Sequence, residues 1–158
     1  MRKDEIPYVA QRLQTLIDQP MTAVGYAADM LTIGFGPEGE SCLHIQCSYR
    51  MATEEAILFD RIDYFIDEEP DNRLFNAVRK LQGQLDGMTV EAADVNQLGD
   101  LTIRFANGVT LLALAMRSDD DECWRFWNDD LWPDQHMVVY GDHVELHGPG
   151  DGCCGICE

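Results

Sequence analysis

Basic residues are scarce in this sequence of 158 residues, which has 11 Lys and Arg against 29 Asp and Glu. The formal net charge at pH 7 is therefore −18. Proteins that bind nucleic acid or anionic membranes draw much of their affinity from Lys and Arg side chains that neutralise phosphate groups. The shortage of such residues argues against both kinds of partner. It predicts a basic partner or none.

A long apolar run is also missing. No stretch approaches the roughly 20 apolar residues that cross a bilayer, and the N-terminus leads into a charged helical pattern where a signal peptide would have its apolar segment. We therefore expect a cytoplasmic protein without a membrane span. Six cysteines are too few for a disulfide framework in a chain of this length, and the cytoplasm would keep them reduced.

Apolar residues are plentiful, at 46% of the chain, and they follow two different periods. Helical spacing marks residues 4–18 and about 72–85, where Asp71 or Asn72 can cap the second helix. Most of the remaining sequence alternates apolar and polar residues, as antiparallel strands do. We interpret residues 1–148 as one α+β domain, mainly antiparallel β-sheet with the N-terminal and central helices packed on one face, and residues 149–158 as a Gly/Cys-rich tail.

A short sequence pattern occurs once in each half of the domain. Ala27-Ala28-Asp29 followed by Leu31-Thr32-Ile33-Gly34-Phe35 recurs as Ala92-Ala93-Asp94 followed by Leu101-Thr102-Ile103-Arg104-Phe105. The pattern predicts two repeated β-meanders, over residues 20–60 and 88–147. Chance recurrence is the alternative, because β-hairpins reuse few residue types.

The acidic residues form two clusters, over residues 54–71 and 119–134. The second cluster is interleaved with tryptophans, and acidic charge around aromatic anchors is typical of a fast, tight interface with a basic protein. We predict such an interface at Asp119, Asp120, Asp121, Glu122, Trp124, Trp127, Asp129 and Asp130. The alternative is that the rings belong to the core and the acids keep the protein soluble.

The C-terminal residues contain the donors of a soft-metal site. Cys154 and Cys157 have Cys-x-x-Cys spacing with Cys153 adjacent, and His143 and His147 lie upstream on one face of a predicted strand. Zinc is the ion that such a mixed thiolate and imidazole set would hold. A single Cys-x-x-Cys is a weak signal, so an exposed tail beside a solvated strand is the alternative.

A second polar row predicts a small-ligand pocket. His44, Gln46 and Arg50 alternate with apolar residues along one predicted strand, so their side chains would share a face. The alternative is that these residues form the solvent-exposed face of a sheet, which gives the same pattern. No nucleophile motif or distinctive acid–base pair accompanies these residues, so we assign no catalytic residue and favour a binding protein over an enzyme.

Residues 20 to about 145 resemble a family of small bacterial proteins without an assigned activity. The resemblance is carried by Ala27–Gly36, Leu43–Arg50 and Gly99–Gly108. The second half is also similar to the small acidic β-rich immunity proteins that neutralise bacterial toxins. These resemblances imply a bacterial cytoplasmic protein and transfer no catalytic residue.

The favoured function is therefore an acidic binding protein that masks a basic protein partner, as an immunity protein masks a toxin. A metal-binding protein that uses the C-terminal His and Cys residues is the alternative. The sequence gives no indication of the oligomeric state.

Overall fold

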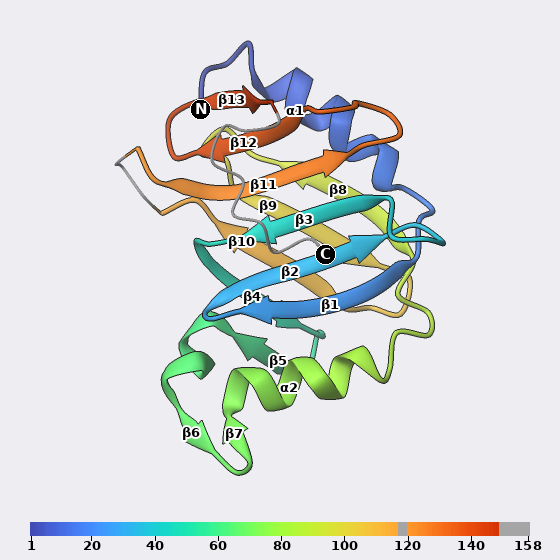
Figure 1. Ribbon diagram of the computed structural model, residues 1–158, viewed down its shortest axis with the longest axis vertical. Coiled ribbons are helices and arrows are strands. Elements are labelled where there is room, and N and C mark those ends of the chain that lie inside the picture. Colours follow the sequence, from blue (N-terminus) through green and yellow to red (C-terminus); the bar gives the residue numbers. More distant parts are fainter. Residues whose placement is uncertain (117–119, 149–158) are drawn as a thin grey trace.

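The computed structural model describes residues 1–116 and 120–148. Two antiparallel sheets face each other as a β-sandwich (Figure 1). Along the first sheet the strands are β1 (Met21–Ala27), β2 (Met30–Phe35), β3 (Ser41–Ile45), β11 (Glu122–Asn128), β12 (His136–Tyr140) and β13 (Val144–His147). Along the second sheet they are β5 (Ile57–Asp60), β4 (Ser48–Ala52), β10 (Thr110–Leu114), β9 (Leu101–Phe105) and β8 (Val90–Val95). A small hairpin, β6 (Asp67–Glu68) and β7 (Asp71–Asn72), extends from the lower end in Figure 1.

The helices close the two lateral edges of the sandwich. Helix α1 (Ile6–Leu13), which continues as the 3₁₀ turn η1 (Gln14–Leu16), packs against β8, whereas α2 (Arg73–Gln82) packs against β1 and β5 (Figure 1). The predicted α+β fold is thus correct, but the helices lie at opposite edges and not on one face. Each inner sheet face is already covered by the other sheet, so the apolar stripes of the helices cover the open sides. None of the helices in the described residues has the length and apolarity needed to span a membrane.

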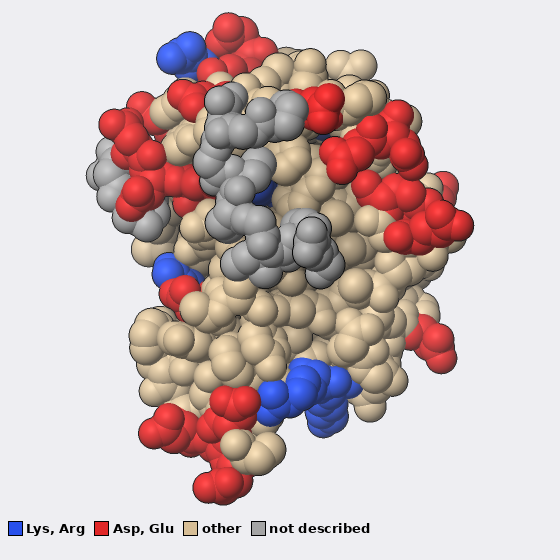
Figure 2. Space-filling model, viewed as in Figure 1, with Lys and Arg blue, Asp and Glu red and all other residues tan. Residues whose placement is uncertain are grey.

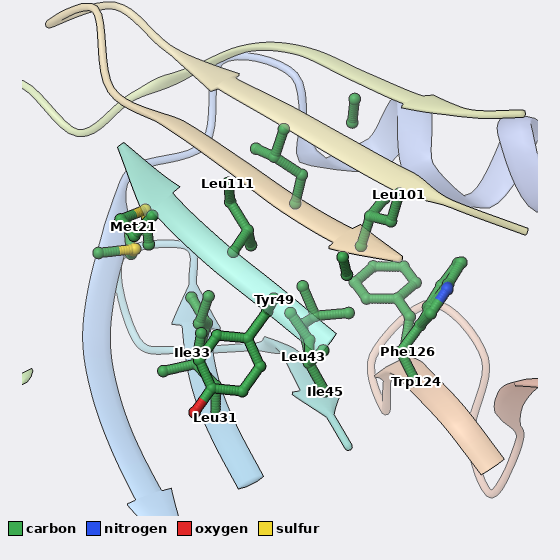
Figure 3. Packing of buried hydrophobic residues seen from close by; sticks show 14 of the residues in the cluster. Met21, Leu31, Ile33, Leu43, Ile45, Tyr49, Leu101, Leu111, Trp124 and Phe126 are labelled. Carbon is green, nitrogen blue, oxygen red and sulfur yellow. The ribbon is translucent and has the colours of Figure 1, made fainter. Parts of the chain in front are cut away.

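Alternating side chains of both sheets fill the space between them (Figure 3). The inward residues of β2, β3 and β11 meet those of β4, β9 and β10, and nearly all are fully buried. They include Leu31, Ile33, Leu43, Ile45, Tyr49, Leu101, Leu111, Trp124 and Phe126. The alternation in the sequence therefore has the predicted physical cause, namely one buried face and one outer face in each strand.

The two halves of the chain build the sandwich in the same way. In the first half β1, β2 and β3 lie in the first sheet and the chain then crosses to β4 and β5 in the second. In the second half β8, β9 and β10 lie in the second sheet and the chain crosses to β11 and β12 in the first. At the centre, β3 pairs with β11 and β10 pairs with β4. One half is thus related to the other by an approximate two-fold arrangement.

Part of the repeated sequence pattern occupies equivalent positions in the two halves. Phe35 of β2 and Phe105 of β9 occupy equivalent positions, and their rings stack with centroids 6.5 Å apart. The Ala-Ala-Asp part does not: Ala28, at φ 52°, begins the turn after β1, whereas Ala93 lies inside β8 and pairs with Ile103. That part of the pattern is coincidental. Gene duplication of the halves stays a prediction.

The chain crosses between the sheets at Gln46 and Cys47, where the sequence predicts one continuous strand. The backbone N–H groups of both residues donate to the carbonyl of Cys123, at 2.9 and 3.0 Å. A hydrogen bond with the thiol of Cys123, together with burial, raises the pKa of the Cys47 thiol far above its ordinary value. These contacts with a residue distant in sequence end β3 and start β4, and they place the residues before and after the crossing in different sheets.

Candidate functional site

The two tryptophans of the predicted interface are buried. Trp124 is 0% exposed and its indole N–H donates to the carbonyl of Gly99 at 2.9 Å. Trp127 is 5% exposed, stacks on His136 and meets the ring of His44 edge-on, with both centroid distances 4.6 Å. Neither indole is available as an anchor for a partner, so this part of the prediction is wrong. Trp124 points into the core, while Trp127 is covered by its histidine neighbours.

The acidic residues of the same prediction lie at opposite ends of β11. Asp120 and Asp121 precede the strand and Asp129 and Asp130 follow it, all four exposed, while Glu122 is paired with Arg125. Asp119 lies outside the described residues. A strand of seven residues at about 3.3 Å per residue keeps the two groups apart. Figure 2 shows acidic side chains toward the margins of this face of the molecule.

The predicted ligand residues do not share a face. His44 is on the outer face of the first sheet and Arg50 is on the outer face of the second, with the sandwich between them. Gln46 lies in the crossover. The prediction of a pocket lined by all three is therefore wrong, because the crossing at Gln46 and Cys47 separates residues that one strand would have aligned.

The histidines gather on the outer face of the first sheet and in the β12–β13 turn. Glu145 lies between the two that were predicted as metal ligands: one carboxylate oxygen is 3.3 Å from Nε2 of His143 and the other is 2.7 Å from Nε2 of His147. Nδ1 of His143 is 2.5 Å from Asp142. The other predicted ligands, Cys153, Cys154 and Cys157, lie outside the described residues. Within residues 1–116 and 120–148 no group of three or more His, Cys, Asp or Glu could hold a metal ion, so the zinc site stays a prediction.

Burial lowers the pKa of His44 to about 4, and the neighbouring positive charge of Arg125 acts in the same direction. Glu122 opposes this shift and His136 adds to it. In contrast, a hydrogen bond to the carboxylate of Asp142 raises the pKa of His143. The pKa values of His44 on the sheet face and His143 in the turn are thus shifted in opposite directions from the ordinary value near 6.5.

The pKa of His44 predicts a loss of stability in mild acid. Between pH 6.5 and about 4 the unfolded chain binds a proton at His44 that the folded protein does not. The part of the free energy of unfolding that depends on an uncharged His44 is therefore fully present above pH 6.5, and it is lost as the pH falls. The expected loss is on the order of 1–2 kcal/mol, allowing for solvent screening. Urea unfolding of the wild type and His44→Gln at pH 7.5 and 4.5 measures it, as the difference between the two proteins.

His143→Gln is the matched control for this measurement. Because the folded pKa of His143 is raised, its contribution is present below the unfolded pKa and disappears as the pH rises, which is the opposite sign. Equal pH dependence of the wild type and His44→Gln would contradict the assignment of a depressed pKa to His44.

The other acidic cluster, residues 54–71, lies at the opposite end of the molecule from β13 (Figure 1). We call residues 53–72 the acidic lobe; it contains the β4–β5 turn, β5, the 3₁₀ helix η2 (Arg61–Phe65) and the β6–β7 hairpin. Four large apolar side chains are exposed there: Ile57 (57%), Leu58 (40%), Ile62 (64%) and Phe65 (68%). Apolar residues inside an acidic run were the available signal. Whether they face the core or solvent cannot be read from a run that short.

Both carboxylates and basic side chains lie near these apolar side chains: Arg50 and Arg61 share a hollow with Ile57 and Ile62, and Leu58 shares another with Glu68, Glu69 and Arg73. Three arginines pair with carboxylates at the lobe or beside it: Arg61 with Asp29, Arg73 with Asp63 and Arg79 with Asp71. Five exposed carboxylates of the lobe have no ion pair among the described residues: Glu54, Glu55, Asp67, Glu68 and Glu69. The lobe therefore combines exposed apolar groups with uncompensated negative charge, which is the combination that the sequence analysis assigned to residues 119–130.

Side-chain contacts support η2 within the lobe. Asp60 and Asp63 form a reciprocal cap at the start of η2, with the Asp60 carboxylate accepting from the N–H of Ile62 at 2.8 Å. The ring of Tyr64 supports Phe65, at 5.0 Å between centroids, and itself rests on Phe75 of α2 at 5.7 Å. Phe65 is thus exposed but held in place from below.

Comparisons with protein-family models, with curated proteins and with solved structures gave no match to this chain. The resemblances to small bacterial proteins and to toxin-immunity proteins therefore stay predictions.

Proposed function

We propose that this protein binds a basic protein partner through the acidic lobe, and that it masks the partner's cationic surface as an immunity protein masks a toxin. The observation that carries the proposal is the exposed pair Ile62 and Phe65 on η2, in a lobe where five exposed carboxylates have no ion pair among the described residues. The proposed interface is therefore residues 53–72, and not residues 119–130 as the sequence suggested.

Charge supports a basic partner. The net charge of −18 attracts a cationic protein over long distances and raises the association rate, while it repels nucleic acid and other acidic proteins. The unpaired carboxylates of the lobe would meet Lys and Arg of the partner without first breaking an internal ion pair. Their desolvation is then the main electrostatic cost of binding.

Preorganised apolar side chains support affinity. Interface hot spots are typically large side chains that become fully covered and that lose little conformational freedom on binding. Phe65 meets both conditions, because it is 68% exposed and already packed on Tyr64. A singly exposed apolar residue needs no explanation, but Ile62 and Phe65 are three residues apart in the 3₁₀ helix η2 and therefore share a face. Apolar side chains grouped in this way are typical of surfaces that partners cover.

Co-expression with the products of adjacent genes, followed by calorimetry on any complex, tests the proposal. We expect a basic partner, and we expect Phe65→Ser to weaken the complex by about 30-fold or more, as a hot-spot residue does. Reversal of four lobe charges (Glu54, Glu55, Glu68 and Glu69 to Lys) is expected to slow association by tenfold or more at low salt.

The control carries the same change in net charge at a different place. Four exposed acids outside the lobe, Asp120, Asp129, Asp130 and Asp134, are replaced by Lys. This variant is expected to bind the partner more tightly than the lobe variant does. The difference in affinity between the two variants is expected to shrink at high salt, because salt screens the charges. A complex that survives the lobe variants but is lost in the control would place the interface elsewhere and contradict the proposal, as would no complex with any adjacent product.

A further inference from the structure

A hollow of about 230 Å³ lies on the outer face of the second sheet. Leu112 and Leu114 of β10 line it together with Ile57 of β5 and Ile62 of η2. The sequence analysis did not identify this site, because the apolar run that contains β10 suits a strand covered on both faces. In the structure Leu112 and Leu114 point outward and remain half-buried.

Two polar side chains of β4 reach the same hollow. Ser48 pairs with Leu114 and Arg50 pairs with Leu112 in the β4–β10 register. The intervening Tyr49 is buried in the core, so alternation directs Ser48 and Arg50 to the outer face. A hydroxyl and a guanidinium therefore lie beside an apolar floor.

The other polar groups that line the hollow already have partners. The Asp60 carboxylate accepts from backbone N–H groups of η2, the Arg61 guanidinium binds Asp29, and the Tyr49 hydroxyl donates to the carbonyl of Asp29 at 2.9 Å. In the part of the chain that the structure describes, Arg50 and Ser48 have neither an ion pair nor a side-chain hydrogen bond.

The approximate two-fold arrangement allows Arg50 to be compared with its equivalent residue in the second half of the chain. Tyr49 pairs with Ala113 and Trp124 pairs with Ile45 at the two sheet centres, which makes Arg125 the equivalent of Arg50. Arg125 has an internal counter-ion, Glu122. The position equivalent to Glu122 in the first half is Cys47, which is buried and uncharged in its thiol form. Arg50 has no carboxylate at that position.

We propose that this hollow binds a small amphipathic anion: an apolar ring or short chain that ends in a carboxylate, with the carboxylate on Arg50. Guanidinium groups bind carboxylates through two parallel hydrogen bonds, and the Ser48 hydroxyl can donate a third. A dry cavity of about 150 Å³ accepts a benzene ring, so the hollow has room for a ring or a chain of similar size. This inference goes beyond the proposed partner and concerns a separate ligand.

Octanoate and octanamide are matched probes, because they share the apolar chain and differ in the charge of the head group. Calorimetry or amide chemical shifts of the full-length protein measure both affinities. We expect octanoate to bind at least tenfold more tightly than octanamide. Arg50→Gln is expected to remove this preference, and Ile62→Ser is expected to weaken both probes.

Arg104→Gln is the control for general charge effects. Arg104 lies on β9, is exposed and pairs with Asp94, so its loss changes the net charge equally but leaves the hollow intact. We expect it to retain the preference for octanoate. The inference is overturned if octanoate shows no saturable binding, if the two probes bind equally, or if Arg104→Gln and Arg50→Gln have the same effect. Arg50 and Ile62 are exposed, so both variants are expected to fold.

Discussion

Trp124→Ala is expected to lower the free energy of unfolding by about 3–5 kcal/mol, the usual cost of removing a large buried aromatic side chain. The indole is fully buried between the sheets, and its N–H satisfies the carbonyl of Gly99. Alanine would leave both a cavity and an unpaired carbonyl in the β8–β9 turn. Urea or guanidinium unfolding followed by far-UV circular dichroism measures the change.

Trp132→Ala provides the comparison for Trp124. Trp132 is only partly buried; it packs on Phe126 and under the guanidinium of Arg12, so we expect a loss of about 1–2 kcal/mol from partial burial and the cation–π contact. Equal losses in the two variants would contradict the assignment of Trp124 to the core. They would also reopen its assignment to an interface.

The second large effect is expected at the stacked pair Phe35 and Phe105. Both rings are almost fully buried and occupy equivalent positions in the two halves. Each single replacement by alanine is expected to cost about 3–5 kcal/mol. The double replacement is expected to cost less than the sum, because each single variant already removes their mutual contact.

Phe65→Ala is the control for these core variants. Phe65 is 68% exposed, so its replacement is expected to change the free energy of unfolding by about 0.5 kcal/mol or less. The same position is expected to contribute strongly to partner binding, which separates a contact residue from a structural one. Strictly additive losses at Phe35 and Phe105 would contradict a shared contact between the halves.

Local patterns in the sequence predicted much of the fold. The apolar stripe of α2 and its cap are confirmed, since the Asn72 side chain accepts from the N–H of Phe75 at 2.9 Å. Gly141 and Asp142 lie in the turn between β12 and β13, and both residue types favour turns. These features depend on neighbours within a few positions, so a sequence pattern is sufficient to predict them.

The candidate site could not be predicted in the same way. A buried indole and an interface indole have the same sequence pattern, and the sequence analysis assigned Trp124 to the wrong one. Ile62 and Phe65 also look like core residues, yet no element of the described chain covers them enough to bury them. Burial depends on which distant segments meet, and spacing along the chain carries little information about that.

The sequence by itself determined the alternation that makes strands, the helical stripes and the strongly negative charge, because these follow from side-chain chemistry and short-range periodicity. Only the tertiary structure decided that the chain crosses between sheets at Gln46 and Cys47. That crossing depends on hydrogen bonds to Cys123, far along the chain. It places His44 and Arg50 on opposite faces, and it leaves Arg50 beside an apolar hollow without an ion-pair partner among the described residues.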